Sequence, residues 1–140
     1  MQWRWHHHPL YVYKVWAARQ EGCLKGYVVV REDLALTSRL KGLKVAIISD
    51  LFFDPQEKNI GKALLKSVIN AYRERTDLMR CDLYSPEIQS FLRREGFIGI
   101  KSQHRFLIYA LKEEYKKCVE QAVSLKKGWH LTYGDSDFDF

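Results

Sequence analysis

Residues 45–72 read VAIISDLFFDPQEKNIGKALLKSVINAY, and this stretch decides the fold. It begins as an apolar run rich in β-branched and aromatic residues, which predicts a buried strand. After Asp54-Pro55 the apolar residues recur at helical spacing, which predicts a helix. The polar elbow between the two leaves the first amides of the helix without partners, at the positive end of the helix dipole. An elbow of this kind suits a phosphate group.

One face of the predicted helix is apolar and should pack on a sheet. This face contains Gly61, Leu64, Leu65, Val68 and Tyr72. The positions pointing elsewhere, which should face solvent, are Lys62, Lys66, Asn70 and Arg73.

Two strands are predicted before the central stretch, over residues 10–18 and 24–31, because both segments are dense in β-branched and aromatic side chains. The polar break Arg19-Gln20-Glu21-Gly22 between them predicts a β-hairpin. Residues 32–43 are polar and weakly patterned, and we expect a loop there.

Residues 78–84 alternate between apolar and polar side chains, which predicts a further strand, parallel to the central one because a helix connects the two. Ser85-Pro86-Glu87 predicts a short helix with Ser85 as its N-cap, and Gly96 should follow its last turn. Two more strands are expected over 97–101 and 105–111, and an amphipathic helix over 112–125.

This order of elements predicts one domain over residues 1–140, a mixed α/β sheet with two parallel strands at its middle. Sheets of this class bind ligands at the carboxyl ends of neighbouring strands. We therefore expect a site between the strand ends near Phe53 and Tyr84, and the polar elbow lies at the first of these ends.

Composition indicates which classes of ligand and partner the chain can have. The formal charge of +6 leaves room for an anionic ligand, and no apolar run approaches the ~20 residues of a membrane span. The three cysteines are an odd number without CxxC spacing, which argues against a disulfide framework and a zinc site. No metal is expected at His6 to His8, because neighbouring residues rarely converge on one ion. The first residues lack the pattern of a signal peptide, so we expect a cytoplasmic protein.

Two common phosphate-binding motifs do not fit the elbow. Gly61-Lys62 is followed by Ala63 where a nucleotide-hydrolase loop needs Ser or Thr. A Rossmann fingerprint requires three glycines, and the elbow offers one.

The elbow resembles motif A of the GCN5-related N-acetyltransferases, which reads Gln or Arg, two residues, Gly, one residue, then Gly or Ala. The window QEKNIG matches this motif at Gln56 and Gly61. Asn59 stands where the family has its first glycine. Asparagine tolerates positive φ better than most residues, so the turn can be kept, while its side chain would come close to a pyrophosphate.

Residues 85–97, SPEIQSFLRREGF, resemble motif B of the same family, with Phe91, Gly96 and Phe97 in register. Ser85 replaces the usual asparagine. Leu92 occupies the position at which many members carry a tyrosine that protonates the departing thiolate of coenzyme A. Because leucine cannot donate a proton, another group or solvent must serve, or the chemistry is absent.

The resemblance covers residues 10–111 and implies the acyl-CoA N-acyltransferase fold, with residues 112–140 as an added helix and acidic tail. The family begins with a strand and helices for which the roughly ten residues before the first strand are too few. We therefore expect a fold shortened at its front, a fragment of a longer chain, or half of an assembly in which another chain completes the fold. The sheet edge left uncovered predicts a homodimer.

The resemblance also implies the site. Backbone amides of the strand end would hold the pantetheine arm and acetyl oxygen of acetyl-CoA, and those of the elbow and helix start would bind its pyrophosphate. The implied cofactor-binding residues are Leu51, Phe52, Phe53, Gln56, Lys58, Asn59, Ile60, Gly61 and Lys62. Asp50 stands where some members place a general base, although a solvent-facing residue or a structural hydrogen-bond partner is the alternative. Tyr84 is the candidate acid, or else a packing residue.

Three functions remain open. The first is acetyl-CoA-dependent N-acetyl transfer to a small-molecule or peptide amine. The second is a catalytically weak module of the same fold that binds acyl-CoA or assembles subunits. The third is a basic nucleic-acid-binding domain, whose stacking platform would come from Trp3, Trp5, Tyr11, Tyr13 and Trp16. Packing is the stronger interpretation of these aromatic residues.

Overall fold

The computed structural model describes residues 11–34, 41–83, 85–99 and 117. The chain divides into two compact units, each described by itself: Met1–Leu83 with Leu131–Phe140, and Tyr84–His130.

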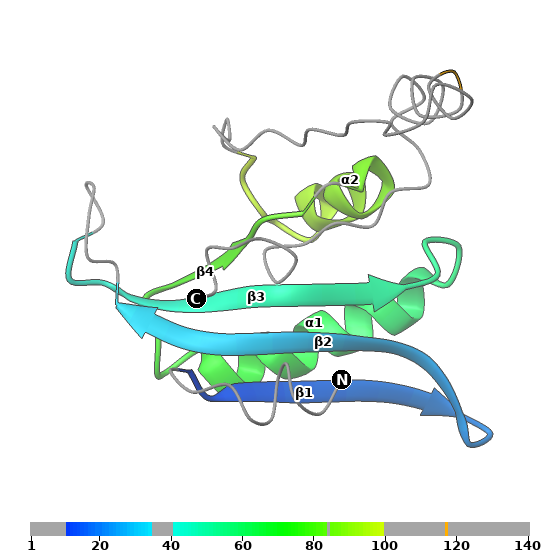
Figure 1. Cartoon of the computed structure of the whole chain (residues 1–140), viewed down its shortest axis with the longest axis horizontal. Helices are drawn as coiled ribbons and strands as arrows, with labels where there is room; N and C mark the ends of the chain where they lie inside the picture. The colour runs from blue at the N-terminus through cyan, green and yellow to red at the C-terminus, as the bar shows by residue number, and fades with distance from the viewer. Residues whose placement is uncertain (1–10, 35–40, 84, 100–116, 118–140) are drawn as a thin grey trace. The chain divides into compact units, whose positions relative to one another are not determined.

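The first unit contains a four-stranded sheet of order β1-β2-β3-β4 and one helix (Figure 1). The strands are β1 (Tyr13–Gln20), β2 (Cys23–Leu34), β3 (Lys44–Phe53) and β4 (Leu78–Cys81), and the helix is α1 (Lys58–Tyr72). β1, β2 and β3 are antiparallel neighbours, and β4 is parallel to β3. The predicted parallel pair is confirmed, although in the described sheet it lies at one side and not in the middle.

The predicted hairpin is confirmed, with a shorter turn. Arg19 and Gln20 belong to β1, and only Glu21-Gly22 separate the strands. Both turn residues have positive φ, 52° and 78°, as a two-residue hairpin turn with the right-handed twist of the strands requires.

The loop predicted over residues 32–43 was wrong at its start. Glu32, Asp33 and Leu34 continue β2, because their backbone stays in register with β3 as far as the pair Leu34 and Lys44. A basic partner also stabilises this acidic segment, because Arg31 Nη1 lies 2.8 Å from Asp33 Oδ2.

The apolar face predicted for α1 is confirmed. All five of its predicted residues are buried, and they are the only buried residues of the helix. The helix contacts β1, β2 and β3, and it lies behind them in Figure 1. At its last turn, the Tyr72 ring meets the Trp16 ring of β1 edge to face, with 5.9 Å between the ring centroids. Trp16 is therefore used in packing, as is Tyr13, which is buried beside Val29.

Gly26 of β2 marks where the start of α1 approaches the sheet most closely. A Cβ atom at this position would lie 2.8 Å from the Phe52 carbonyl oxygen, 3.0 Å from Phe53 Cβ and 3.1 Å from Ile60 Cγ2. The first two atoms belong to the partner strand β3, and the third belongs to the first turn of α1. Only a residue without a side chain lets strand and helix come this close.

The second unit contains α2 (Pro86–Arg94), whose predicted start is confirmed. The Ser85 side chain accepts a hydrogen bond from the Ile88 amide at 3.4 Å, and Pro86 is the first helical residue. Gly96 has a φ of 96°, the left-handed conformation expected after a helix end. The buried residues of α2 are Ile88, Phe91 and Leu92.

Several predicted elements lie largely outside the described residues. Residues 97–99 have no regular secondary structure, and the remainder of the strands predicted over 97–101 and 105–111 is not described. Of the helix predicted over 112–125, only Lys117 is described, and it is helical and exposed. Within the described ranges, no helix is both long and apolar enough to cross a membrane.

Gly26→Ala should destabilise the first unit by about 1 to 3 kcal/mol, because the added methyl group meets backbone and packed side chains. Urea unfolding followed by circular dichroism measures this loss. Leu24→Ala, at a half-exposed position of the same strand, is the matched control and should change the free energy of unfolding by less than about 1 kcal/mol. Equal stability of wild type and Gly26→Ala would contradict the close approach.

Candidate functional site

The site is built around the second half of β3, where the pairing of the strand changes on both sides. Toward β2, Val29 pairs with Asp50 and Val30 pairs with Ile48, so Ser49 is an extra residue in β3, a β-bulge. Toward β4, the parallel ladder ends at the pair Ile48 and Cys81. β3 continues to Phe53 with β2 as its neighbour. Leu51 to Phe53 therefore lie beyond the end of the β4 ladder.

Ser49 was missed by the sequence analysis. It is fully buried, and its hydroxyl has no hydrogen-bond partner among the described residues. An unsatisfied buried hydroxyl costs about 1 to 3 kcal/mol, so such groups are expected where a ligand can supply the partner. The available signal was a single hydroxyl in the apolar run before Asp50.

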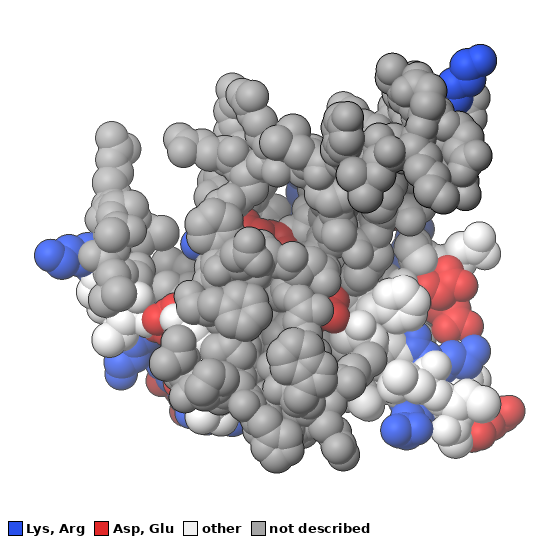
Figure 2. Space-filling view, viewed as in Figure 1, with Lys and Arg blue, Asp and Glu red and all other residues white. Residues whose placement is uncertain are grey.

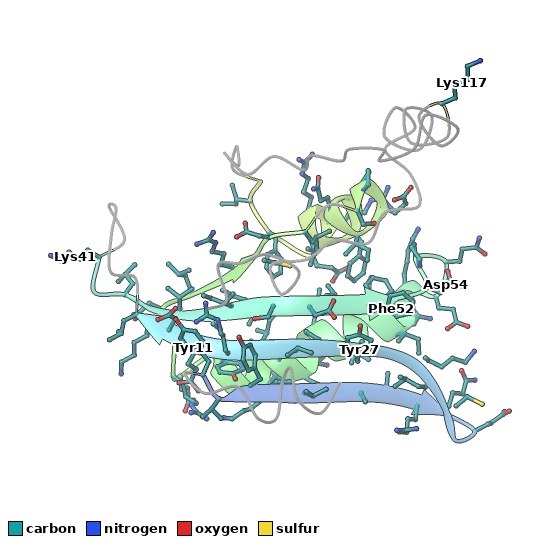
Figure 3. All side chains as sticks on the ribbon, viewed as in Figure 1. Tyr11, Tyr27, Lys41, Phe52, Asp54 and Lys117 are labelled. Atoms are coloured by element: carbon teal, nitrogen blue, oxygen red, sulfur yellow. The ribbon has the colours of Figure 1, made fainter. Side chains whose placement is uncertain are left out.

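The elbow after β3 is a tight turn closed by Asp54, which Figure 3 shows at the end of the strand. The Glu57 amide donates to the Asp54 carbonyl oxygen at 2.8 Å, and the Gln56 amide donates to Asp54 Oδ1, also at 2.8 Å. A side chain that accepts from the amide two residues on is a common way to fix a turn. The Gln56 side chain is exposed.

The first turn of α1 has backbone amides that are available as hydrogen-bond donors. The N-cap residue Glu57 makes no side-chain capping bond, and its carbonyl oxygen accepts the Ile60 amide at 2.9 Å. The amides of Lys58 and Asn59 have no partner among the described residues. No acidic residue lies in the first turn, and Glu57 is held by Lys25 at 3.2 Å. Two unpaired amides at the positive end of the helix dipole can receive an anion.

The predicted cofactor-binding residues divide by burial. Leu51, Phe53 and Gly61 are buried, Ile60 is half-buried, and the others are exposed. Lys58 is exposed, and Lys62 is exposed as predicted. All nine residues belong to the segment from the end of β3 to the second turn of α1, so they lie close together.

Asn59 differs from the expectation. It is the second residue of α1, and the only non-glycine residue with positive φ in the described ranges is Glu21. Its tolerance of positive φ is therefore not used. The Asn59 side chain is exposed.

Asp50 is half-buried at the bulge, and its Oδ2 accepts a hydrogen bond from the Tyr27 hydroxyl of β2 at 2.9 Å. Asp50 is therefore a hydrogen-bond partner within the sheet, as the alternative interpretation expected. The action of Asp50 as a base stays a prediction. Tyr27 was missed because contact across strands depends on their register. Tyr84, the predicted acid, lies outside the described residues. Leu92 is 5% exposed in α2 and is a packing residue there.

Cys81 ends the β4 ladder. Burial raises the pKa of its thiol far above the ordinary value of 9.0, and the negative charges of Asp82 and Asp50 raise it further. The thiol therefore stays protonated near neutral pH and is a poor nucleophile.

Charge around the described residues is mixed. Figure 2 shows basic and acidic side chains close to one another on the face it draws, without a broad field of one sign among the residues it describes. Within those residues, no three His, Cys, Asp or Glu side chains come together in a way that could hold a metal ion.

Comparison with solved structures identifies the fold. A mutant of the BH1408 protein from Bacillus halodurans matches with a TM-score of 0.58 and 19% identity over 69% of this chain and 66% of that one. An acetyltransferase from Trypanosoma brucei matches with a TM-score of 0.51 and 24% identity over 70% of this chain and 69% of that one. Neither a protein-family model nor a curated protein sequence matches the chain.

At these identities the comparison shows the fold alone. The chain has a mixed α/β sheet that matches the fold of the GCN5-related N-acetyltransferases. It spans slightly less than two thirds of the length of the Bacillus halodurans protein. The shortened front of the fold stays a prediction.

Iodoacetamide at about pH 8 should modify Cys23 well before Cys81, because Cys23 is exposed and the Cys81 thiol stays protonated. A Cys118→Ser background removes the third thiol, and mass spectrometry measures the rate at each site. In guanidinium chloride the two rates should converge. If Cys81 reacted as fast as Cys23 in the folded protein, its protected environment would be contradicted.

Proposed function

We propose that the chain binds acetyl-CoA at the end of β3 and the start of α1, and that it transfers the acetyl group to a primary amine. The observation that carries this proposal is the uncapped start of α1, where the amides of Lys58 and Asn59 face no competing carboxylate in their own turn. Pyrophosphate is the anion that this arrangement suits, since it has several acceptor oxygens and needs several convergent donors.

The end of β3 fits the remainder of the cofactor. The pairing of β3 with β4 ends at Ile48, and an extended chain with amide groups is proposed to bind beside the later part of β3 in the manner of an added strand. The pantetheine arm of coenzyme A is such a chain.

The chemistry assigned to the chain is acyl transfer. The ammonium group of the acceptor gives one proton to Asp50, directly or through water, and the neutral nitrogen attacks the thioester carbon. The C–N bond forms and the C–S bond breaks. The departing thiolate takes up a proton from solvent, and the nitrogen loses its second proton to give the amide. Backbone amides near Leu51 would stabilise the oxyanion.

Asn59→Asp should weaken acetyl-CoA binding about tenfold or more, because a carboxylate beside the uncapped amides repels the pyrophosphate. The same change should stabilise the helix by about 0.3 to 1 kcal/mol, since an acidic residue in the first turn complements the dipole. Titration calorimetry measures the affinity, and thermal unfolding measures the stability. Because affinity should fall while stability rises, the result distinguishes a loss of binding from a loss of folding.

Asn70→Asp is the control for Asn59→Asp. It makes the same charge change at an exposed position in the last turn of α1, and acetyl-CoA affinity should stay within about twofold of wild type. Wild type without measurable affinity for acetyl-CoA or CoA, or equal losses in the two variants, would overturn the proposed site.

Asp50→Asn should lower kcat by about 10² to 10⁴ if Asp50 accepts the proton of the amine. Glu74→Gln removes an exposed carboxylate in the turn after α1 and should leave kcat unchanged. Steady-state rates over a panel of primary amines, read as free thiol released from acetyl-CoA, give both numbers. Full activity of Asp50→Asn would show that Asp50 is not the base.

A second function is favoured by one observation. Leu92 is buried in α2 at the position where many related enzymes have a tyrosine that protonates the thiolate. A chain that lacks this acid can serve as an acyl-CoA-binding module with little or no turnover. Calorimetric binding of acetyl-CoA without thiol release over the whole amine panel would select this function.

A further inference from the structure

Lys25 lies at a second β-bulge of the sheet, in β2. On the β1 side, Ala18 pairs with Gly26. The next residue of β1, Arg19, pairs with Leu24, so Lys25 is an extra residue between the two pairs. In a regular strand, Lys25 would point to the face opposite that of Gly26, away from the helix. A bulge changes the direction of a side chain, so the direction of Lys25 is set by the bulge.

The bulge lies level with the elbow that precedes α1. Gly26 pairs with Phe53, the last residue of β3, so Lys25 lies one residue beyond that ladder. Figure 1 shows the turn between β1 and β2 and the elbow after β3 at the same end of the sheet. Here Lys25 Nζ lies 3.2 Å from Glu57 Oε1. The bulge therefore coincides with an ion pair between the hairpin and the elbow.

The backbone of Glu57 is fixed on both sides. Its amide donates to the Asp54 carbonyl oxygen at 2.8 Å, and its carbonyl oxygen accepts from the Ile60 amide at 2.9 Å. Its carboxylate makes no capping bond to the helix, and the partner of this carboxylate among the described residues is Lys25. Only the side chain of Glu57 can change its place without breaking the elbow.

The position of this carboxylate matters because two groups attract it. The positive end of the helix dipole attracts a carboxylate as it attracts an anionic ligand. A Glu57 side chain turned toward the amides of Lys58 and Asn59 would occupy donors that the ligand needs, and its charge would repel the phosphates. The ion pair with Lys25 opposes this movement.

The ion pair contributes little to folding. The side chains of Lys25 and Glu57 are 36% and 39% exposed, and ion pairs as exposed as this one stabilise a fold only slightly. The bulge also interrupts the ladder between β1 and β2. A role in the site accounts for both features better than a role in stability.

We propose that Lys25 is a positioning residue for acetyl-CoA: it holds the Glu57 carboxylate at the hairpin and thereby keeps the amides of Lys58 and Asn59 open to the pyrophosphate. This inference rests on the proposed function. Lys25 acts through Glu57 and not by touching the ligand, and this distinction makes the inference testable.

The test is a double-mutant cycle on the full chain, with CoA affinity measured by titration calorimetry. Lys25→Met should weaken CoA binding roughly fivefold to tenfold, because the released carboxylate repels the pyrophosphate. In a Glu57→Gln background the same change should cost less than about twofold, since no carboxylate remains to be held. Lys25→Arg keeps a cation that can pair with Glu57, and its affinity should stay within about twofold of wild type.

Lys14→Met is the matched control. Lys14 also forms an exposed ion pair, with Glu32 at 3.9 Å, and its Nζ lies 5.6 Å from the centre of the Tyr72 ring at the other end of α1. The change removes the same charge, and CoA affinity should stay within about twofold of wild type. Thermal unfolding of each variant checks that it is folded.

Equal losses for Lys25→Met with and without the Glu57 carboxylate would overturn the inference, because Lys25 would then act on the ligand directly. No loss in Lys25→Met, or an equal loss in Lys14→Met, would overturn it as well. The same cycle with inorganic pyrophosphate separates the inference from the proposed function. The expected coupling with pyrophosphate, without any binding of CoA, would keep the role of Lys25 and remove the proposed cofactor, and no binding of either probe would overturn both.

Discussion

The absence of a side chain at Gly26 is the constraint on which the rest of the site depends. The end of β3 and the first turn of α1 both occupy space that a Cβ atom would need, with Phe52, Phe53 and Ile60 as the nearest neighbours. Because the helix start is held against the strand end, the uncapped amides of Lys58 and Asn59 lie next to the part of β3 that has left the β4 ladder. The proposed phosphate site and the proposed site for the extended arm of the cofactor are therefore neighbours.

The bulge at Ser49 adds a second effect to this arrangement. It moves the alternation of β3 by one residue, so that Asp50 pairs with Val29 and its carboxylate lies within reach of the Tyr27 hydroxyl. A regular strand would send Asp50 to the opposite face. One extra residue thus places a carboxylate, a phenol and the exposed Phe52 ring on the face away from the helix, beside the backbone proposed to hold the acetyl group.

Sequence periodicity predicted the elements well where one rule acts locally. The buried face of α1 follows from its spacing of apolar residues, and the start of α2 follows from Ser85-Pro86. The site was harder to predict from the sequence, because its features depend on the register between strands that are distant in the chain. Neither the bulge at Ser49 nor the contact between Tyr27 and Asp50 can be read from a single strand. Asn59 was expected to use an unusual backbone, and ordinary helical geometry was found.

The central claim is that the end of β3 and the start of α1 together bind coenzyme A. The most direct measurement is a titration of the ¹⁵N-labelled chain with CoA, followed through the backbone amide resonances. The account predicts that the largest shifts occur at Leu51 and at Lys58 to Lys62. These shifts should saturate and should fit a single dissociation constant. Shifts confined to other parts of the chain, or no shifts at all, would contradict it.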